Sequence, residues 1–255
     1  ALGYQDTPPQ RARLERIIGV LAIAVIPIAV SVHTVIGWIF ALTLRPMWHS
    51  TIFGPYFVMG AIYSGIAAIL IAMVILRRAY GLGQYFKPVH FDYMGRLLLV
   101  FSLLWFYFTF AEYLTAFYGK EPAEMRTFWA KVAGPFAVPF WLMVLCCAVI
   151  PLALMARAAT RTPRGTLIAG IAVVIGMWLE RFNIVVPTSV NPRWEMETLG
   201  HYFPSWVELS IMAGTLAGFV LVYMIATKFF PIISLWEIQE GRDKPVEEVS
   251  ERVAS

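Results

Sequence analysis

Four ionisable side chains and one histidine lie inside otherwise apolar stretches of this chain, and they are the residues best suited to chemistry. They are Glu112, Glu180, Arg181, Glu208 and His33. Ionisable groups are rare within membrane-spanning segments, where they pair with one another, line polar cavities or relay protons. Carboxylates and imidazole are also the usual groups for accepting and releasing protons. The set therefore predicts either a buried ion pair or a proton-handling site, provided that the surrounding elements span a membrane.

The elements that hold these residues are six apolar stretches, each 25 to 29 residues long. They cover residues 16–44, 50–76, 92–118, 130–158, 165–189 and 203–230. About 20 apolar residues suffice to cross a hydrocarbon core of ~30 Å. Hydrophobic residues make up 59% of the chain and charged ones 14%, against about 25% charged residues in soluble domains. We predict an all-α integral membrane protein, a bundle of six transmembrane helices, and not a soluble domain.

The segments that flank this membrane domain, 16–230, are polar. Residues 1–15 read as a polar connector and residues 231–255 as a charged cytoplasmic tail. The chain begins with Ala1 and has no signal-peptide pattern before its first apolar stretch. We therefore expect that it starts partway through a longer protein.

Lys and Arg are distributed unevenly between the two sides that this topology defines. One side receives twelve: Arg11, Arg13, Arg16, Arg77, Arg78, Lys87, Arg157, Arg161, Arg164, Lys228, Arg242 and Lys244. The other side receives five: Arg45, Lys120, Arg126, Lys131 and Arg193. Because cytoplasmic loops carry the excess of positive charge, both ends are predicted to be cytoplasmic. The expected location is the bacterial inner membrane, with lipid and not nucleic acid as the surroundings of this chain.

Several cofactor classes are disfavoured by residue type and spacing. The two cysteines, Cys146 and Cys147, are adjacent within one stretch, so neither a disulfide framework nor an iron–sulfur or zinc site is predicted. Bis-histidine haem ligation needs two histidines at matching depth. Only His33 lies well inside a stretch, so no haem site is expected, and no metal ligands are assigned.

The five candidate residues share the outer half of the predicted membrane. Counted at ~1.5 Å per residue, His33, Glu112, Glu180, Arg181 and Glu208 all lie nearer the outer than the inner end of their stretches. Two interpretations remain open. In the first, Glu180 or Glu208 pairs with Arg181 and Glu112 is protonated and hydrogen-bonded, so that they only join helices. In the second, the carboxylates form a proton relay or line a polar cavity. His33 has two interpretations of its own, a helix-packing histidine or a proton acceptor.

Small residues and prolines predict how the helices pack. Gly60, Gly65, Gly214 and Gly218 would allow close approach of helix backbones. Kinks are expected at the in-span prolines. These are Pro27, Pro139 and Pro151.

Two long runs resemble a known family. The first is Ser31-Val-His-Thr-Val-Ile-Gly-Trp-Ile-Phe-Ala41, and Met47-Trp-His-Ser-Thr-Ile-Phe-Gly-Pro-Tyr-Phe-Val-Met-Gly-Ala-Ile-Tyr-Ser-Gly65 follows it. Trp178-Leu-Glu-Arg-Phe-Asn183 and Pro204-Ser-Trp-Val-Glu208 fit the same pattern. The chain resembles the ten-span branch of the NrfD/polysulfide-reductase membrane subunit family, and within it the quinol-oxidising subunit of alternative complex III. Its six stretches are similar to the fifth to tenth spans of that branch.

The resemblance implies a function as well as a fold. It implies a respiratory subunit that binds and oxidises quinol, either menaquinol or ubiquinol, near the outer face, with His33 as the quinol-binding and catalytic residue. Glu112, Glu180, Arg181 and Glu208 would form a proton relay or buried ion pair. Electrons would pass to an iron–sulfur subunit docked at the outer face, with a c-type cytochrome and further membrane subunits as partners. The chain itself would bind no haem or iron–sulfur cluster, and would be catalytic only within its complex.

The residues alone also permit two other functions. A carboxylate cluster suits a proton-coupled transporter, and a purely structural membrane anchor would need no site at all. A transporter should purify as a homogeneous oligomer with uptake activity, whereas a redox subunit should purify with iron–sulfur and haem proteins. An anchor predicts that neutral replacements of all buried acids leave turnover unchanged.

Overall fold

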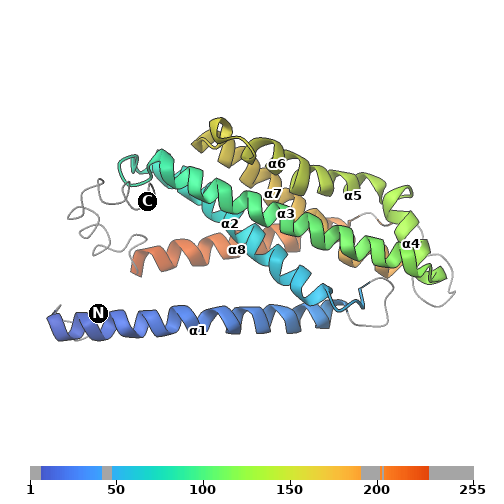
Figure 1. Ribbon diagram of the computed structural model, residues 1–255, viewed down its shortest axis with the longest axis horizontal. Coiled ribbons are helices and arrows are strands. Elements are labelled where there is room, and N and C mark those ends of the chain that lie inside the picture. The colour runs from blue at the N-terminus through green and yellow to red at the C-terminus, as the bar shows by residue number, and fades with distance from the viewer. Residues whose placement is uncertain (1–6, 42–47, 191–201, 203, 230–255) are drawn as a thin grey trace, which may run out of the picture. The chain divides into compact units, whose positions relative to one another are not determined.

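The computed structural model describes residues 7–41, 48–190, 202 and 204–229, and within them every regular element is helical (Figure 1). The elements are α1 (Pro8–Ala41), α2 (Phe53–Ala79), α3 (Pro88–Gly119), α4 (Pro122–Val132), α5 (Ala137–Val144), a π-helical segment (Leu145–Val149), α6 (Ile150–Met155), a 3₁₀ turn (Ala158–Thr160), α7 (Pro163–Val190) and α8 (Trp206–Phe229). Six helical segments are long and apolar enough to cross a membrane, namely Ala12–Ile39, Phe53–Ala79, Pro88–Gly119, Ala137–Met155, Pro163–Val190 and Trp206–Phe229. The predicted fold class, an all-α protein with six spans, is confirmed.

Two helix boundaries differ from those expected. Helix α1 begins at Pro8, inside the predicted connector, and a proline is well tolerated in the first turn of a helix. The stretch expected at 130–158 is divided, because α4 ends at Val132 and the apolar span begins only at Ala137. Gly134 makes the turn between them possible, since a Cβ there would lie 2.7 Å from the Ala130 Cα. Arg45, Arg193 and the tail 231–255 lie outside the described residues.

The chain consists of two compact units, residues 1–201 and residues 202–255. In the first unit, α2 is central and packs against α1, α3 and α7, while α5 and α6 pack against α7. Fully buried side chains at this centre include Tyr63, Leu70, Leu98 and Val173. In the second unit, α8 is the one described helix.

Glycines allow α2 and α7 to approach each other closely. A Cβ on Gly170 would lie 3.1 Å from the Ala67 carbonyl oxygen, and one on Gly60 would lie 2.8 Å from Met177 Cε. The predicted packing role of Gly60 is therefore confirmed by its contact with α7. Nothing lies within 4 Å of a Cβ built on Gly65.

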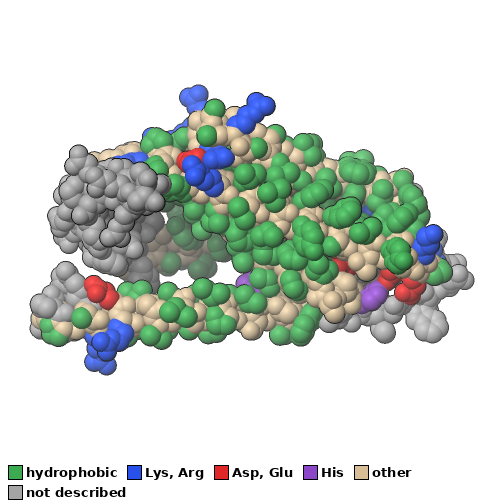
Figure 2. Space-filling model, viewed as in Figure 1, with side chains coloured by type: hydrophobic (Ala, Val, Ile, Leu, Met, Phe, Trp, Pro, Cys, Tyr) green, Lys and Arg blue, Asp and Glu red, His purple; other side chains and the backbone are tan. Residues whose placement is uncertain are grey.

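Large apolar side chains cover the outside of the first unit. Figure 2 shows hydrophobic side chains along the length of its helices and basic ones near their ends. On α1, the exposed fraction of Ile23 is 74% and that of Val20 is 62%. Side chains of this kind are stable in contact with lipid tails, so this surface suits a bilayer.

The helical segment that contains the two cysteines is distorted in a way that Pro151 explains. Proline has no N–H, so the carbonyl of Cys147, four residues earlier, receives no helical hydrogen bond from it. The Tyr63 hydroxyl donates to this carbonyl oxygen at 2.7 Å and the Ser102 hydroxyl at 3.0 Å. The π-helical segment Leu145–Val149 lies at the same place. The freed carbonyl thus joins α2 and α3 to the fourth span, and both cysteines are buried and unpaired.

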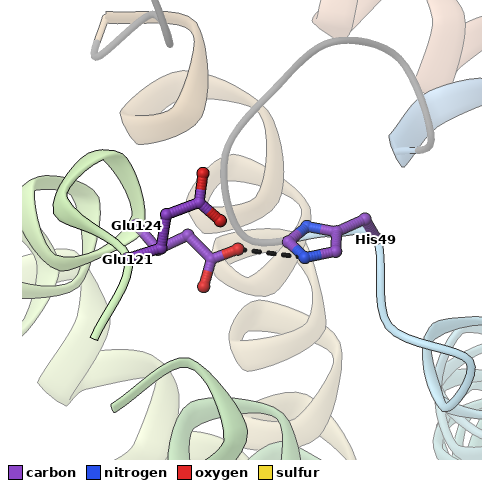
Figure 3. Close-up of side chains that lie close together, drawn as sticks. All are labelled: His49, Glu121 and Glu124. Atoms are coloured by element: carbon purple, nitrogen blue, oxygen red, sulfur yellow. Dashed lines mark ion pairs between the residues drawn. The ribbon is translucent and has the colours of Figure 1, made fainter. Parts of the chain in front are cut away.

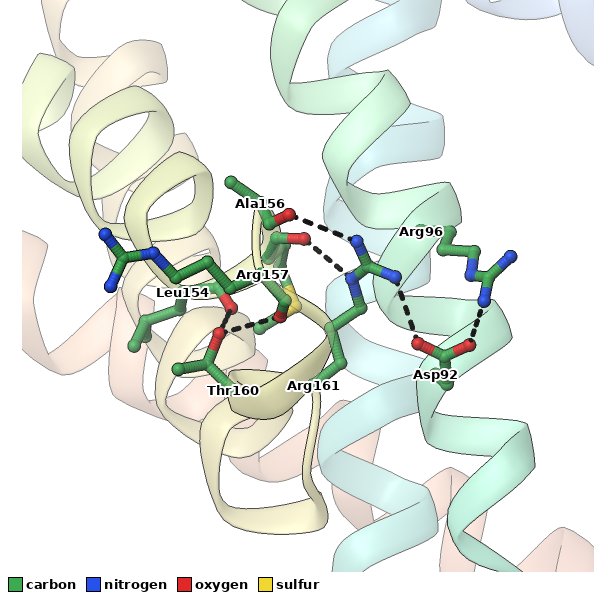
Figure 4. Close-up of polar contacts among 8 residues, drawn as sticks. Asp92, Arg96, Leu154, Ala156, Arg157, Thr160 and Arg161 are labelled. Carbon is green, nitrogen blue, oxygen red and sulfur yellow. Dashed lines mark hydrogen bonds and ion pairs between the residues drawn. The ribbon is translucent and has the colours of Figure 1, made fainter.

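At the end of the unit where α3 begins, charged side chains hold the helices together (Figure 4). The Asp92 carboxylate pairs with Arg161 at 3.0 Å and with Arg96 at 2.7 Å. Arg161 also donates to the carbonyl oxygens of Met155 and Ala156, at the end of α6. These contacts fix the start of α3 beside the α6–α7 connection.

Candidate functional site

His33 lines a groove between α1 and α2. The groove has a volume of about 310 Å³ and is lined by Val25, Ile26, Ala29, Val30, His33, Val58, Ala61 and Ile62. His33 is the one ionisable side chain among these eight described lining residues. Toward the C-terminal end of α1 the helices are in contact, since a Cβ on Gly37 would lie 3.2 Å from Phe57. An apolar cavity with one convergent polar group has the character of a small-molecule site.

The hydrogen bond of His33 determines which ring nitrogen is basic. Its Nδ1 lies 2.8 Å from the carbonyl oxygen of Ala29, one turn earlier on α1. A carbonyl oxygen only accepts hydrogen bonds, so Nδ1 must carry the hydrogen. In the neutral ring Nε2 is then the proton acceptor.

Glu180 and Arg181 belong to α7 and lie against another face of α2 than the one that lines the groove. Glu180 has an exposed fraction of 1%, and its Oε1 accepts a hydrogen bond from the Trp105 indole at 2.6 Å. Its Oε2 pairs with Arg181 Nη1 at 3.0 Å. The Arg181 guanidinium also stacks on Phe57, 4.0 Å from the ring centroid. Gly60 leaves room for this pair, because a Cβ there would lie 3.4 Å from Glu180 Oε2.

Two tyrosines, the buried Tyr56 and the partly buried Tyr113, extend the polar region from Glu180 toward the end of the unit that carries α4. Tyr56 interacts electrostatically with Glu180 and lies in the core at 2% exposure. Tyr113 interacts with both Glu180 and Glu112. The residues Glu180, Tyr56, Tyr113, Glu112 and Lys131, called the buried polar column below, therefore connect the middle of the bundle with its α4 end.

The α4 end of the column is formed by Glu112 and Lys131. Glu112 accepts a hydrogen bond from the Ser50 hydroxyl and is 3% exposed. Lys131 is fully buried, with its Nζ 4.4 Å from the Trp48 ring centroid. Burial lowers the pKa of Lys131 to about 7, while the nearby Glu112 carboxylate acts in the opposite direction. An amine with that pKa can both accept and release a proton near neutral pH.

Trp48 anchors the segment that leads into α2. Its indole donates to the Ile184 carbonyl oxygen at 3.1 Å, and its ring stacks parallel to Tyr56. Lys131 lies against the same ring. The segment is thereby held against α4 and α7.

The structure brings some of the predicted residues together and separates others. Glu180 pairs with Arg181, as one of the two sequence interpretations required, and Tyr113 links Glu180 to Glu112. His33 instead occupies the α1–α2 groove, on a different face of α2. Its role and those of the carboxylates stay predictions.

Glu208 belongs to the second unit and makes local contacts there. Its carboxylate accepts hydrogen bonds from the Ser205 N–H at 2.6 Å and from the Tyr202 hydroxyl at 3.0 Å. The Glu208 N–H points back to the Ser205 hydroxyl at 3.3 Å. This reciprocal pattern is a capping box at the start of α8. A part for Glu208 in a proton relay stays a prediction.

Sequence reasoning missed four members of the site. Lys131 was counted among the loop cations, but it is buried against Trp48 and Tyr113. Tyr56, Tyr113 and Trp105 were given no role, although all three interact with Glu180. A lysine at the edge of a predicted span was the one available signal, because the aromatic partners depend on helix rotation.

Comparison with known proteins identifies the family to which this chain belongs. The family model described as "Polysulphide reductase, NrfD" matches residues 10–192. That range is more than two thirds of the chain. The chain belongs to the NrfD polysulphide reductase family. His33, Glu112, Glu180, Arg181 and Lys131 all fall within the matched range, and Glu208 falls outside it.

Three curated relatives have informative names. A selenate reductase subunit of Mesobacillus selenatarsenatis is 26% identical, over 97% of this chain and 61% of its own length. A putative dimethyl sulfoxide reductase membrane subunit of Halobacterium salinarum is also 26% identical, over 91% of this chain and 58% of its own length. An Hdr-like menaquinol oxidoreductase integral membrane subunit of Archaeoglobus fulgidus is 27% identical, over 83% of this chain and 57% of its own length. The chain thus spans about six tenths of the length of the curated relatives it matches.

Proposed function

We propose that this chain is a membrane subunit of a redox complex and that it oxidises a quinol in the His33 groove. The observation that carries the proposal is the cavity of about 310 Å³ whose otherwise apolar lining contains one imidazole. A quinone ring is flat and largely apolar, with polar atoms at two ends, so it suits such a cavity. The Nδ1 contact with Ala29 leaves Nε2 to accept the proton of a quinol hydroxyl.

The redox step balances in electrons and protons. A quinol loses two electrons and two protons to become a quinone. His33 accepts one proton at Nε2, and solvent or the buried polar column accepts the other. The two electrons pass to an iron–sulfur partner, which we place at the α4 end, the predicted outer face. The NrfD-like relatives support this proposal, because their names describe subunits of reductases and, in one case, of a menaquinol oxidoreductase.

Three finer assignments belong to the same proposal. They are the direction of electron flow, a relationship to the quinol-oxidising subunit of alternative complex III, and a correspondence with six of that branch's ten spans. The positive-charge distribution supports cytoplasmic termini, and the column that ends at Lys131 supports proton movement coupled to quinol oxidation. A c-type cytochrome is the further partner that this assignment implies.

Replacement of His33 tests the site directly. In the assembled complex, His33→Ala should lower quinol-dependent electron transfer by about 100-fold or more, the usual contribution of a general base. The amount of assembled complex should change little, because the side chain is only partly buried. Ser31→Ala is the matched control, since Ser31 also bonds to a carbonyl one turn earlier but is exposed outside the groove.

A second variant tests the groove without touching the histidine. Ala61 is one of its lining residues, so Ala61→Phe should fill the cavity and raise the KM for quinol. Ile69→Phe places the same ring on an exposed face of α2 and should leave the KM unchanged. Equal turnover per complex for wild type, His33→Ala and Ala61→Phe would refute the quinol site.

A further inference from the structure

His49, Glu121 and Glu124 converge at the α4 end of the first unit, outside the site described above (Figure 3). One ligand atom from each of the three lies within 4.8 Å of the others. His49 Nε2 and Glu124 Oε1 are 3.1 Å apart. In a tetrahedral zinc site, bonds of about 2.0–2.2 Å to nitrogen and oxygen separate neighbouring ligand atoms by about 3.3 Å. The distance between His49 and Glu124 is therefore close to that between two ligands of one metal ion.

The local fold explains why the two glutamates face His49. Helix α3 ends at Gly119, and the left-handed conformation of the next residue, Lys120 (φ 52°), reverses the chain. Glu121 is the N-cap residue of α4, and Glu124 lies one turn further along, on the same side of the helix. Trp48 is held against Ile184, so His49, the next residue, is directed to this turn.

The electrostatics around His49, Glu121 and Glu124 favour a bound cation. Glu124 is 5% exposed although it is a carboxylate, and it is close enough to the buried Glu112 for the two charges to repel each other. A buried carboxylate is normally paired or coordinates a metal ion. Lys131 interacts with Glu112 and lies against the Trp48 ring. The carboxylates of Glu121 and Glu124 would attract a divalent ion.

We propose that His49, Glu121 and Glu124 bind a divalent transition-metal ion of the Zn²⁺ type. One imidazole nitrogen and two carboxylate oxygens are ligands that such ions accept, and a water molecule would complete four-coordination. The ion would tie the segment before α2 to the α3–α4 turn. Ser50, which follows His49, would then be held in its hydrogen bond to Glu112.

Metal binding can be measured independently of turnover. Zn²⁺ titration of the purified complex, followed calorimetrically after chelator treatment, should show one site per chain. His49→Ala and Glu121→Gln should weaken that site by at least about tenfold, because even partners beyond the ligands change metal affinity by about 10–100-fold. Both residues are exposed, so these variants should fold. His90→Ala, at the opposite end of α3, is the matched control and should bind as wild type does.

A spectroscopic variant distinguishes coordination from loose association. His49→Cys loaded with Co²⁺ should show a thiolate-to-metal absorption band in the near ultraviolet, and His90→Cys should not. The proposal is wrong if wild type binds no Zn²⁺ at millimolar concentration, or if His49→Ala and Glu121→Gln bind it as tightly as wild type does. Because the readout is binding, neither result depends on the quinol proposal.

Discussion

The Trp105 indole N–H donates to Glu180 Oε1 across 2.6 Å, from α3 to α7, inside the helix bundle. The same carboxylate pairs with Arg181, so both of its oxygens have a partner of positive character. Glu180 thereby has a hydrogen bond to one carboxylate oxygen and an ion pair at the other while it is almost completely buried. This arrangement explains why a carboxylate in an apolar span need not destabilise the fold.

Replacing Glu180 should separate its structural contribution from its role in proton transfer. Glu180→Ala leaves Arg181 without its ion-pair partner, and loss of one member of a buried pair costs about 3–5 kcal/mol. We expect the lower end, because 35% of the Arg181 side chain is exposed. The amount of assembled protein should therefore fall. Glu180→Gln should assemble, because it keeps an oxygen for Trp105, but it should impair proton movement measured in vesicles.

The control for Glu180 is Glu15→Ala, which removes an exposed carboxylate from α1. It should change neither assembly nor proton movement. Wild-type levels of both in Glu180→Ala would contradict the importance of the pair.

A methyl group at Gly60 should destabilise the crossing of α2 and α7. The Gly60→Ala side chain would meet Met177 Cε at 2.8 Å and Arg181 Nη2 at 3.3 Å. Overpacking of this kind costs about 1–3 kcal/mol. Gly65→Ala, five residues later on the same helix, adds its methyl group to open space and should be neutral or slightly stabilising. Thermal unfolding in detergent compares the two, and equal melting temperatures would refute the tight contact.

The buried Lys131 should produce a characteristic pH dependence of stability. Its pKa is about 7 in the folded protein and about 10.4 in an unfolded chain. Between these values the unfolded state binds more protons, so the free energy of unfolding should rise with pH. Below pH 7 the cost of the buried charge is fully present.

The Lys131→Met variant isolates this contribution. The melting temperature of wild type should rise between pH 7 and about pH 10 relative to that of Lys131→Met. Lys120→Met, which removes an exposed lysine from the same region, should retain the wild-type pH dependence. Parallel curves of melting temperature against pH for wild type and Lys131→Met would contradict a difference between the pKa values of Lys131 in the folded and unfolded states.

The two hydrogen bonds to the carbonyl oxygen of Cys147 should be energetically coupled. Tyr63→Phe and Ser102→Ala each remove one hydrogen bond and should each cost about 1 kcal/mol. The double variant should cost more than the sum of the two, because the carbonyl freed by Pro151 would then be buried without a donor. A double-mutant cycle of unfolding free energies measures this coupling, and strict additivity would contradict it.

The linear pattern of the chain was sufficient to predict which segments span the membrane. Apolar stretches of 25 to 29 residues can be accommodated only as helices, because a lone segment in lipid must satisfy its own backbone hydrogen bonds. The sequence alone also singled out Glu180 and Arg181, because a charged residue in an apolar stretch can be recognised without knowing which way the helix faces. It could not separate α4 from the span that follows, because the residues from Val132 onward are apolar and the break depends on Gly134.

What surrounds each ionisable group was decided only by the tertiary structure. Adjacent residues on a helix point about 100° apart, so a sequence cannot tell whether Tyr56 or Val58 of α2 faces Glu180. The crossing at Gly60 turns Tyr56 into the core and leaves Val58 to the His33 groove. Lys131 is a buried partner of Trp48 for a similar reason, because the fold brings α4 against the segment that leads into α2. Residue types determined which groups could carry charge, and helix packing determined their partners, since partners come from segments that are distant along the chain.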